Sequence, residues 1–130
     1  MQLKLLTMDY RPLTIDHWLF CMKRYCLALD LHDNPALIAE YEDWHTRVSP
    51  EIKKSITDAG VTRFDIYRVG NRMFAIMDTT DDFDLERKAG MDAANPAVQE
   101  WENLMWKYQK PLPFAKPGEK WMIMRQIFQL

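Results

Sequence analysis

Helical and strand-like patterns of apolar residues alternate along this chain. Across residues 34–60, apolar positions recur at the three- and four-residue spacing that is typical of a helix. Asn34-Pro35 is a strong helix start, because Asn caps the first turn and Pro suits the first helical position. Pro50 interrupts this helix and restarts it, since proline cannot supply an interior amide. Asn95-Pro96 repeats the start signal ahead of a second apolar stripe, which ends at Tyr108.

Strand-like runs surround these helices at residues 25–31, 61–69, 72–78 and 121–130. Gly70-Asn71 is a two-residue turn signal, so the second and third runs are predicted to pair as a hairpin. The resulting order is β-α-β-β-α-β. That order is the ferredoxin-like arrangement of an α+β fold, in which helices cover one face of an antiparallel sheet.

The other face of such a sheet must be solvated or covered, and the apolar strands favour a cover. Two subunits packed sheet on sheet would form a dimeric α/β barrel with a cavity in each half, so we expect a homodimer. Residues 1–21 have no clean period. We interpret them as an N-terminal extension before a single domain of residues 22–130.

Composition narrows the range of partners. The net charge of −2 and the scattered Lys and Arg residues give no basic field, so nucleic acid is not an expected partner. No apolar run approaches the ~18 residues of a membrane span, and charged residues near the N-terminus break up any signal peptide. Cys21 and Cys26 form neither a disulfide framework nor a zinc spacing. A cytoplasmic protein that binds no membrane is the resulting expectation.

A metal site is not expected either. The acidic cluster Asp81-Asp82-Phe83-Asp84 lacks the Gly and the later Glu of an EF-hand loop, so we interpret it as a solvated helix start. There is also no Gly-rich phosphate loop and no nucleophile elbow. The sequence therefore predicts no metal and no cofactor.

Tyr41 and His45 form the sharpest candidate site. Residues four apart share a helix face, so a phenol and an imidazole are presented side by side. Histidine titrates near neutrality, and such a pair can bind a hydroxylated molecule and move a proton on it. The same positions also suit plain core, which is the commoner role of a histidine on an apolar stripe. Trp101 lies in the second stripe, where core packing is again the commoner role.

Several spaced motifs run through residues 22–130. They are Tyr41-x-x-x-His45-x-x-x-x-Pro50-Glu51, Gly60, Ile66-Tyr67, Gly70-Asn71-Arg72-x-Phe74, Gln99-x-Trp101 and Phe128-x-Leu130. On these motifs, nearly the whole chain resembles the L-rhamnose mutarotase family. Its members are small dimeric ferredoxin-like enzymes that interconvert sugar anomers without a cofactor, and some relatives act on L-fucose.

The resemblance implies roles for individual residues. His45 matches the catalytic proton donor, Tyr41 matches a sugar-binding tyrosine, and Trp101 matches the first of two tryptophans that line the substrate pocket. Two positions depart from the pattern: Phe64 stands where a sugar-binding tyrosine is expected, and Glu102 replaces the second tryptophan. These changes leave the proton chemistry intact and leave the sugar open, with L-rhamnose the first expectation and L-fucose the second.

The expected reaction is general acid/base opening of the sugar ring, which needs no metal, redox centre or covalent nucleophile. The base for the anomeric proton is left open among Glu102, Asp65 and water. Two alternatives remain at this stage. One is a cofactor-free monooxygenase or haem-degrading enzyme on the same dimeric barrel. The other is a non-catalytic sugar-binding module in which Tyr41 and His45 are core.

Overall fold

The computed structural model describes residues 22–130, so the expected N-terminal extension lies outside the described residues. Strands and helices alternate through this part of the chain. In chain order they are β1 (Lys23–Leu31), α2 (Pro35–Trp44), α3 (Pro50–Asp58), β2 (Val61–Val69), β3 (Arg72–Thr79), α4 (Leu85–Ala93), α5 (Pro96–Trp106), β4 (Gln109–Lys110) and β5 (Met122–Ile123). None of the described helices has the length and apolarity to cross a membrane.

Side-chain caps start the helices where the sequence predicts them. The Oδ1 atoms of Asn34 and Asn95 each accept hydrogen bonds from two amides of the first turn, in α2 and α5 respectively. Ser49 caps α3 and Pro50 begins it, so the predicted interruption of the first helix is confirmed. Asp84 caps α4 in the same way, which fits its interpretation as a helix start.

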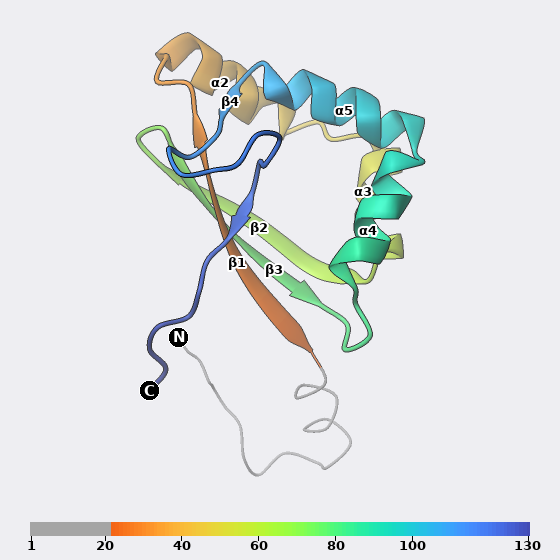
Figure 1. Cartoon of the computed structure of the whole chain (residues 1–130). Helices are drawn as coiled ribbons and strands as arrows, with labels where there is room; N and C mark the ends of the chain where they lie inside the picture. The colour runs from red at the N-terminus through yellow and green to blue at the C-terminus, as the bar shows by residue number, and fades with distance from the viewer. Residues whose placement is uncertain (1–21) are drawn as a thin grey trace.

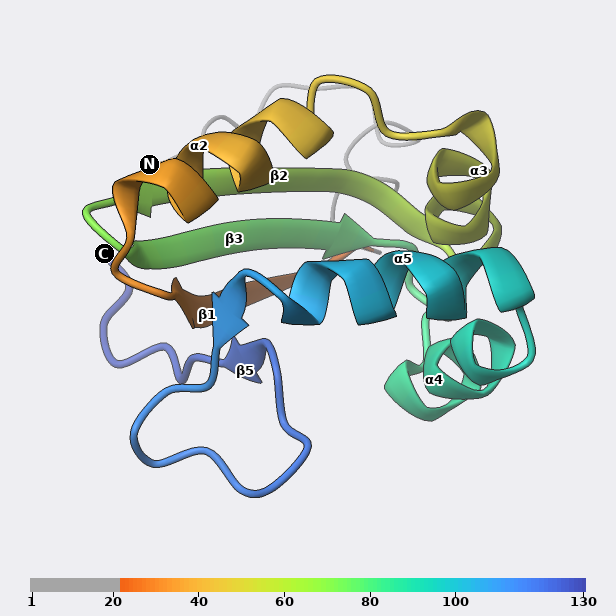
Figure 2. The ribbon, with the colours of Figure 1, turned by 90° about the horizontal axis from the view of Figure 1, so that it is seen from above.

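The sheet has the strand order β2-β3-β1-β4, and its paired strands are antiparallel. β2 and β3 form the predicted hairpin, with Gly70 in the turn at a φ of 58°. All four described helices lie on one face of the sheet (Figure 1), and from above α2 runs along β2 while α5 runs over β1 (Figure 2). The α+β, ferredoxin-like prediction is confirmed.

The predicted strand over residues 121–130 is wrong in its extent. β5 spans only Met122–Ile123 and pairs with the middle of β1. Gln109–Lys110, directly after α5, supplies β4 and pairs with the end of β1. The segment between them carries prolines, which lack an amide donor and cannot continue a ladder. The last strand of the predicted topology is therefore divided into two short pieces.

The core lies between the sheet and the helices. Leu29 and Leu31 of β1 and Met73 of β3 are almost fully buried against Met105 and Tyr108. The three strand residues occupy alternate positions along their strands, so their side chains point to the helical face. The same alternation directs the other half of each strand away from the helices.

That opposite sheet face carries apolar side chains. Phe74 and Ile76 of β3 lie on it between their neighbours on β1 and β2, and Tyr67 and Val69 at the edge are 52% and 78% exposed. In Figure 1 none of the described helices covers this face. An apolar sheet face of this kind is the feature from which the sequence predicts a dimer.

Candidate active site

A cavity of about 710 Å³ lies between the edge strand β2 and the helical layer. Its size falls within the range of about 300–1,000 Å³ that is typical of small-molecule sites. Helices α2 and α3 and strand β2 supply most of its lining. The lining residues are Tyr41, Glu42, His45, Val48, Ile52, Lys53, Ile56, Phe64, Ile66, Tyr67, Arg68, Met73 and Trp101.

His45 stands at the C-terminal end of α2 with its ring half-buried in this cavity. Its Nδ1 atom lies 2.8 Å from the backbone carbonyl oxygen of Tyr41. Because a carbonyl oxygen only accepts, Nδ1 carries the hydrogen and donates it. Nε2 is therefore the nitrogen that gains or loses a proton, which suits a general acid or base facing a bound molecule.

Aromatic rings hold the imidazole in place. The ring of Tyr41 lies 4.5 Å from that of His45, and the ring of Trp101 lies 5.5 Å away at 72°. Trp44 in turn packs edge-on against Trp101. Helices α2 and α5 are far apart in sequence, yet they bring together Tyr41, His45 and Trp101, three of the residues predicted for the site.

Tyr41 lines the cavity but belongs to the core as well. Its side chain is buried beside Leu29 and Tyr108, and its hydroxyl oxygen accepts a hydrogen bond from Gln109 Nε2 at 3.2 Å. Burial raises the pKa of Tyr41 to about 12. Gln109 was not predicted as a neighbour of the site, because β4 is only two residues long and carries no periodic signal.

The phenol of Tyr41 is expected to make the fold lose stability at high pH. Its folded-state pKa of about 12 exceeds the ordinary value of 10.0, so above pH 10 the unfolded chain releases this proton first. The free energy of unfolding should fall by about 1.4 kcal/mol from this group at pH 11. Denaturant unfolding of the parent and of Tyr41→Phe at pH 8 and pH 11 checks this. Equal alkaline losses in the two proteins would contradict it.

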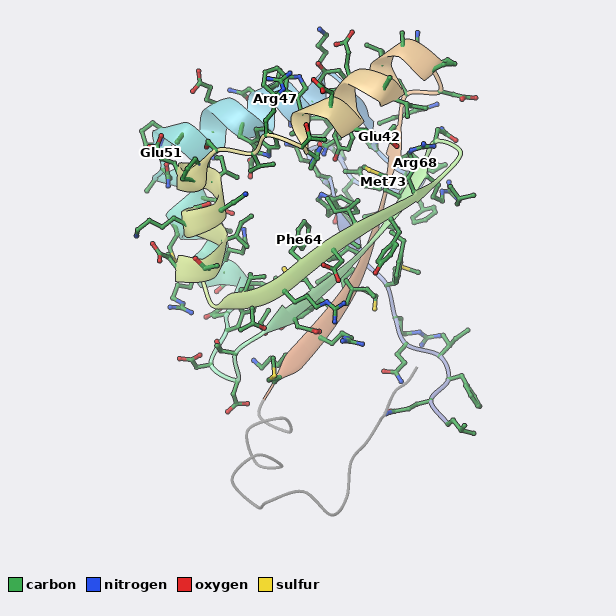
Figure 3. All side chains as sticks on the ribbon, turned by 180° about the vertical axis from the view of Figure 1, so that it is seen from behind. Glu42, Arg47, Glu51, Phe64, Arg68 and Met73 are labelled. Atoms are coloured by element: carbon green, nitrogen blue, oxygen red, sulfur yellow. The ribbon has the colours of Figure 1, made fainter. Side chains whose placement is uncertain are left out.

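Phe64 also reaches the cavity. It lies on β2, which places its ring on the helical side of the sheet, and it packs edge-on against Trp121. Figure 3 shows Phe64 in the space between β2 and the helices. At this position the chain therefore presents an apolar ring where a tyrosine would present a hydroxyl.

Glu102 and Asp65 do not line the cavity. Glu102 follows Trp101 on α5, and successive helical residues point about 100° apart, so the two cannot face the same way. Its backbone carbonyl accepts a hydrogen bond from Lys120 Nζ at 3.1 Å. Asp65 lies between two inward-facing residues of β2, so it points to the opposite sheet face, where it forms an ion pair with Arg63.

Three charged residues of the lining were not predicted from the sequence: Glu42, Lys53 and Arg68. Glu42 follows Tyr41 on α2, and Arg68 occupies the same face of β2 as Phe64. Their side chains form an ion pair between the helix and the strand. The only signal for Arg68 was its alternate position along β2, and it became meaningful once α2 was placed over that strand.

No metal centre is assembled in the part of the chain that the structure describes. Within residues 22–130, no group of three or more His, Cys, Asp or Glu side chains is placed to hold a metal ion. The groups that the cavity offers are an imidazole, a phenol, aromatic rings, the ammonium group of Lys53 and one ion pair. Their chemistry is proton transfer and hydrogen bonding to a polar molecule with an apolar side.

Solved structures with the same fold support the topology. The chain aligns with an L-rhamnose mutarotase from Formosa agariphila at a TM-score of 0.62 and 21% identity, over 83% of this chain and 98% of that one. It also aligns with tetracenomycin F2 cyclase from Streptomyces glaucescens, a type II polyketide cyclase, at a TM-score of 0.52 and 16% identity, with the same coverage. At these identities the likeness shows the fold alone.

Relatives with higher sequence identity show the family of this chain. An L-fucose mutarotase of Xanthomonas campestris pv. campestris is 47% identical over 84% of this chain and 89% of its own length. An L-rhamnose mutarotase of Phocaeicola vulgatus is 34% identical over 74% of this chain and 85% of its own length. The family model for L-rhamnose mutarotase matches residues 24–130. This chain belongs to the L-rhamnose mutarotase family.

Proposed function

We propose that this chain interconverts the α and β anomers of a 6-deoxy-L-hexose, either L-rhamnose or L-fucose. The observation that carries the proposal is His45, whose Nε2 is left free to exchange a proton inside a cavity of suitable size. Membership of the mutarotase family favours this reaction over oxygen chemistry, haem degradation or sugar binding alone. The relative at 47% identity favours testing L-fucose beside L-rhamnose.

Ring opening is the chemical step. His45 as imidazolium gives its Nε2 proton to the ring oxygen while the anomeric hydroxyl loses a proton, and the bond between the ring oxygen and the anomeric carbon breaks. Rotation about the neighbouring carbon–carbon bond and reclosure give the other anomer. The proton then returns to Nε2. Water takes the anomeric proton, because neither Glu102 nor Asp65 lines the cavity and the lining carboxylate of Glu42 is held in its ion pair with Arg68.

The other candidate residues orient the sugar. The oxygen of Tyr41 accepts from Gln109, so the hydrogen of its own hydroxyl remains to be donated to a sugar hydroxyl. The rings of Trp101 and Phe64 offer an apolar surface to the methyl group and the apolar side of a deoxysugar. Loss of a hydroxyl at position 64 thus makes the pocket more suited to an apolar group.

Optical rotation tests this proposal. A pure anomer of L-rhamnose or L-fucose relaxes to the anomeric equilibrium after it is dissolved, and catalytic amounts of the protein are expected to accelerate this relaxation. D-Glucose, which has a hydroxyl in place of the methyl group and belongs to the opposite stereochemical series, is the control sugar. Unchanged relaxation of both 6-deoxy sugars in the presence of the protein would overturn the proposal.

We further propose that two copies pack through their open sheet faces and act in the cytoplasm. The apolar side chains of Phe74 and Ile76, with the exposed Tyr67 and Val69 beside them, support the pairing. Burial of such a surface is the main source of stability in homodimers. The free thiol of Cys26 agrees with a reducing compartment.

Ile76→Glu is expected to convert the dimer to a monomer. The new carboxylate would have to be buried without a partner between the two sheets, at a cost of several kcal/mol. Light scattering coupled to size-exclusion chromatography measures the mass of parent and variant. Thr57→Glu adds the same charge on exposed α3 and should leave the dimer intact. A monomeric parent, or an Ile76→Glu protein that stays dimeric, would contradict the proposed packing.

A further inference from the structure

An ion pair at the cavity joins the helix α2 to the strand β2. Arg68 Nε donates to Glu42 Oε2, and Arg68 Nη1 donates to the carbonyl oxygen of Gly70 at 2.7 Å. Both charged side chains line the cavity and stay partly open to solvent, with 34% of Arg68 and 53% of Glu42 exposed. Figure 3 shows the two residues side by side where α2 passes over β2.

Each partner keeps a group that can bind a ligand. Glu42 Oε1 and Arg68 Nη2 have no hydrogen-bond partner among residues 22–130. An acceptor and a donor therefore lie next to one another at the cavity. Two neighbouring sugar hydroxyls match this arrangement, because each hydroxyl can donate one hydrogen bond and accept another, and bonds to charged groups are the stronger kind.

The cavity has few other polar side chains that could bind sugar hydroxyls. In the described part of the chain, Glu42 is the only carboxylate of the lining, and most of the other lining side chains are apolar. His45 is committed to the ring oxygen, Tyr41 can donate to one hydroxyl, and Lys53 on α3 offers a donor but no acceptor. Sugar hydroxyls that enter an apolar cavity without partners cost free energy, so the remaining ones need further polar groups.

The helix sets which hydroxyls the pair can reach. Glu42 precedes His45 by three residues, so the two residues neighbour one another on α2 with a rise of about 4.5 Å between them. This distance is comparable with the width of a pyranose ring. When His45 is at the ring oxygen and the anomeric carbon, the ion pair therefore lies toward the hydroxyls on carbons 3 and 4.

We propose that Glu42 and Arg68 bind the hydroxyls on carbons 3 and 4 of the sugar and thereby select its configuration at carbon 4. L-Rhamnose and L-fucose differ in configuration at carbons 2 and 4, so this pair discriminates between them. The inference rests on the proposed function, since it assumes that a 6-deoxy-L-hexose occupies the cavity with its anomeric carbon at His45.

The ion pair could instead serve only to hold α2 against β2. Steady-state anomer exchange separates the two roles when it is measured for the better sugar and for its 4-deoxy analogue. The parent should show a KM about ten- to hundredfold lower for the sugar than for the analogue. Glu42→Met and Arg68→Met, which remove the acceptor and the donor, should abolish that difference while kcat for the sugar changes only a few-fold.

Arg47→Met is the matched control. It removes a neighbouring ion pair, between Asp43 on α2 and Arg47 just after this helix, and neither residue lines the cavity. This variant should keep the parent's preference for the sugar over its 4-deoxy analogue.

Each other outcome is decisive. If the parent shows no preference for the sugar over its 4-deoxy analogue, the inference is wrong. It is also wrong if the Glu42 and Arg68 variants keep that preference and KM rises equally for both compounds, because the pair is then structural. If the parent does not accelerate exchange of either sugar, the proposed function itself fails and takes this inference with it.

Discussion

Replacement of His45 by asparagine is expected to slow catalysed anomer exchange by about 100- to 10,000-fold. The asparagine amide keeps a donor near the position of Nδ1, from which it can still reach the carbonyl of Tyr41. It offers nothing at the position of Nε2. The variant therefore loses the group that protonates the ring oxygen while the local helix end is preserved.

The kinetic measurement should separate kcat from KM. In His45→Asn, kcat should fall and the melting temperature should stay close to that of the parent, because His45 is half-buried at the edge of the cavity rather than in the core. Thr46→Asn, at the next position and exposed, is the control and should retain the parent rate within a few-fold. Parent-like kcat in His45→Asn would remove the residue from the mechanism.

Leu29→Ala is expected to have the largest effect on stability, with the free energy of unfolding lowered by about 2–5 kcal/mol. Leu29 is 0% exposed in the middle of β1, and it packs in one cluster with Tyr41, Met73 and Tyr108. The surrounding sheet and helices cannot fully collapse around the missing atoms. Because Tyr41 shares this cluster, the floor of the cavity should loosen as well.

Urea unfolding at one fixed protein concentration measures this loss, since the apparent stability of the proposed dimer would depend on concentration. Leu85→Ala makes the same chemical change at the exposed start of α4, where Leu85 is 42% exposed. Its effect should stay below about 1 kcal/mol. A loss for Leu29→Ala as small as that of Leu85→Ala would show that the core is organised differently.

The local parts of the fold could be predicted from the sequence because their causes are local. Asn-Pro pairs start α2 and α5, Gly70 permits the tight turn between β2 and β3, and helical spacing marks the buried stripes. The division of the last strand could not be predicted. β4 and β5 are two residues each, and only their pairing with distant β1 defines them.

The same distinction holds for the site. Helical spacing placed Tyr41 and His45 on one face, and the resemblance to a family pointed to Trp101. The cavity contact of Arg68 depends on how α2 lies over β2, which no local pattern encodes. Glu102 was expected at the site because it stands where the family has its second pocket tryptophan, but the rotation of the helix directs it away from the cavity.

Saturation transfer in proton NMR between the two anomers at equilibrium tests directly whether His45 catalyses anomer exchange. One anomeric proton of L-fucose or L-rhamnose is irradiated while the other is observed, with catalytic parent protein, with His45→Asn or with no protein. With the parent, transfer should lie well above the protein-free level for at least one sugar, and with the variant it should stay near that level. No transfer with either sugar in the parent, or equal transfer in parent and variant, would contradict the catalytic role of His45.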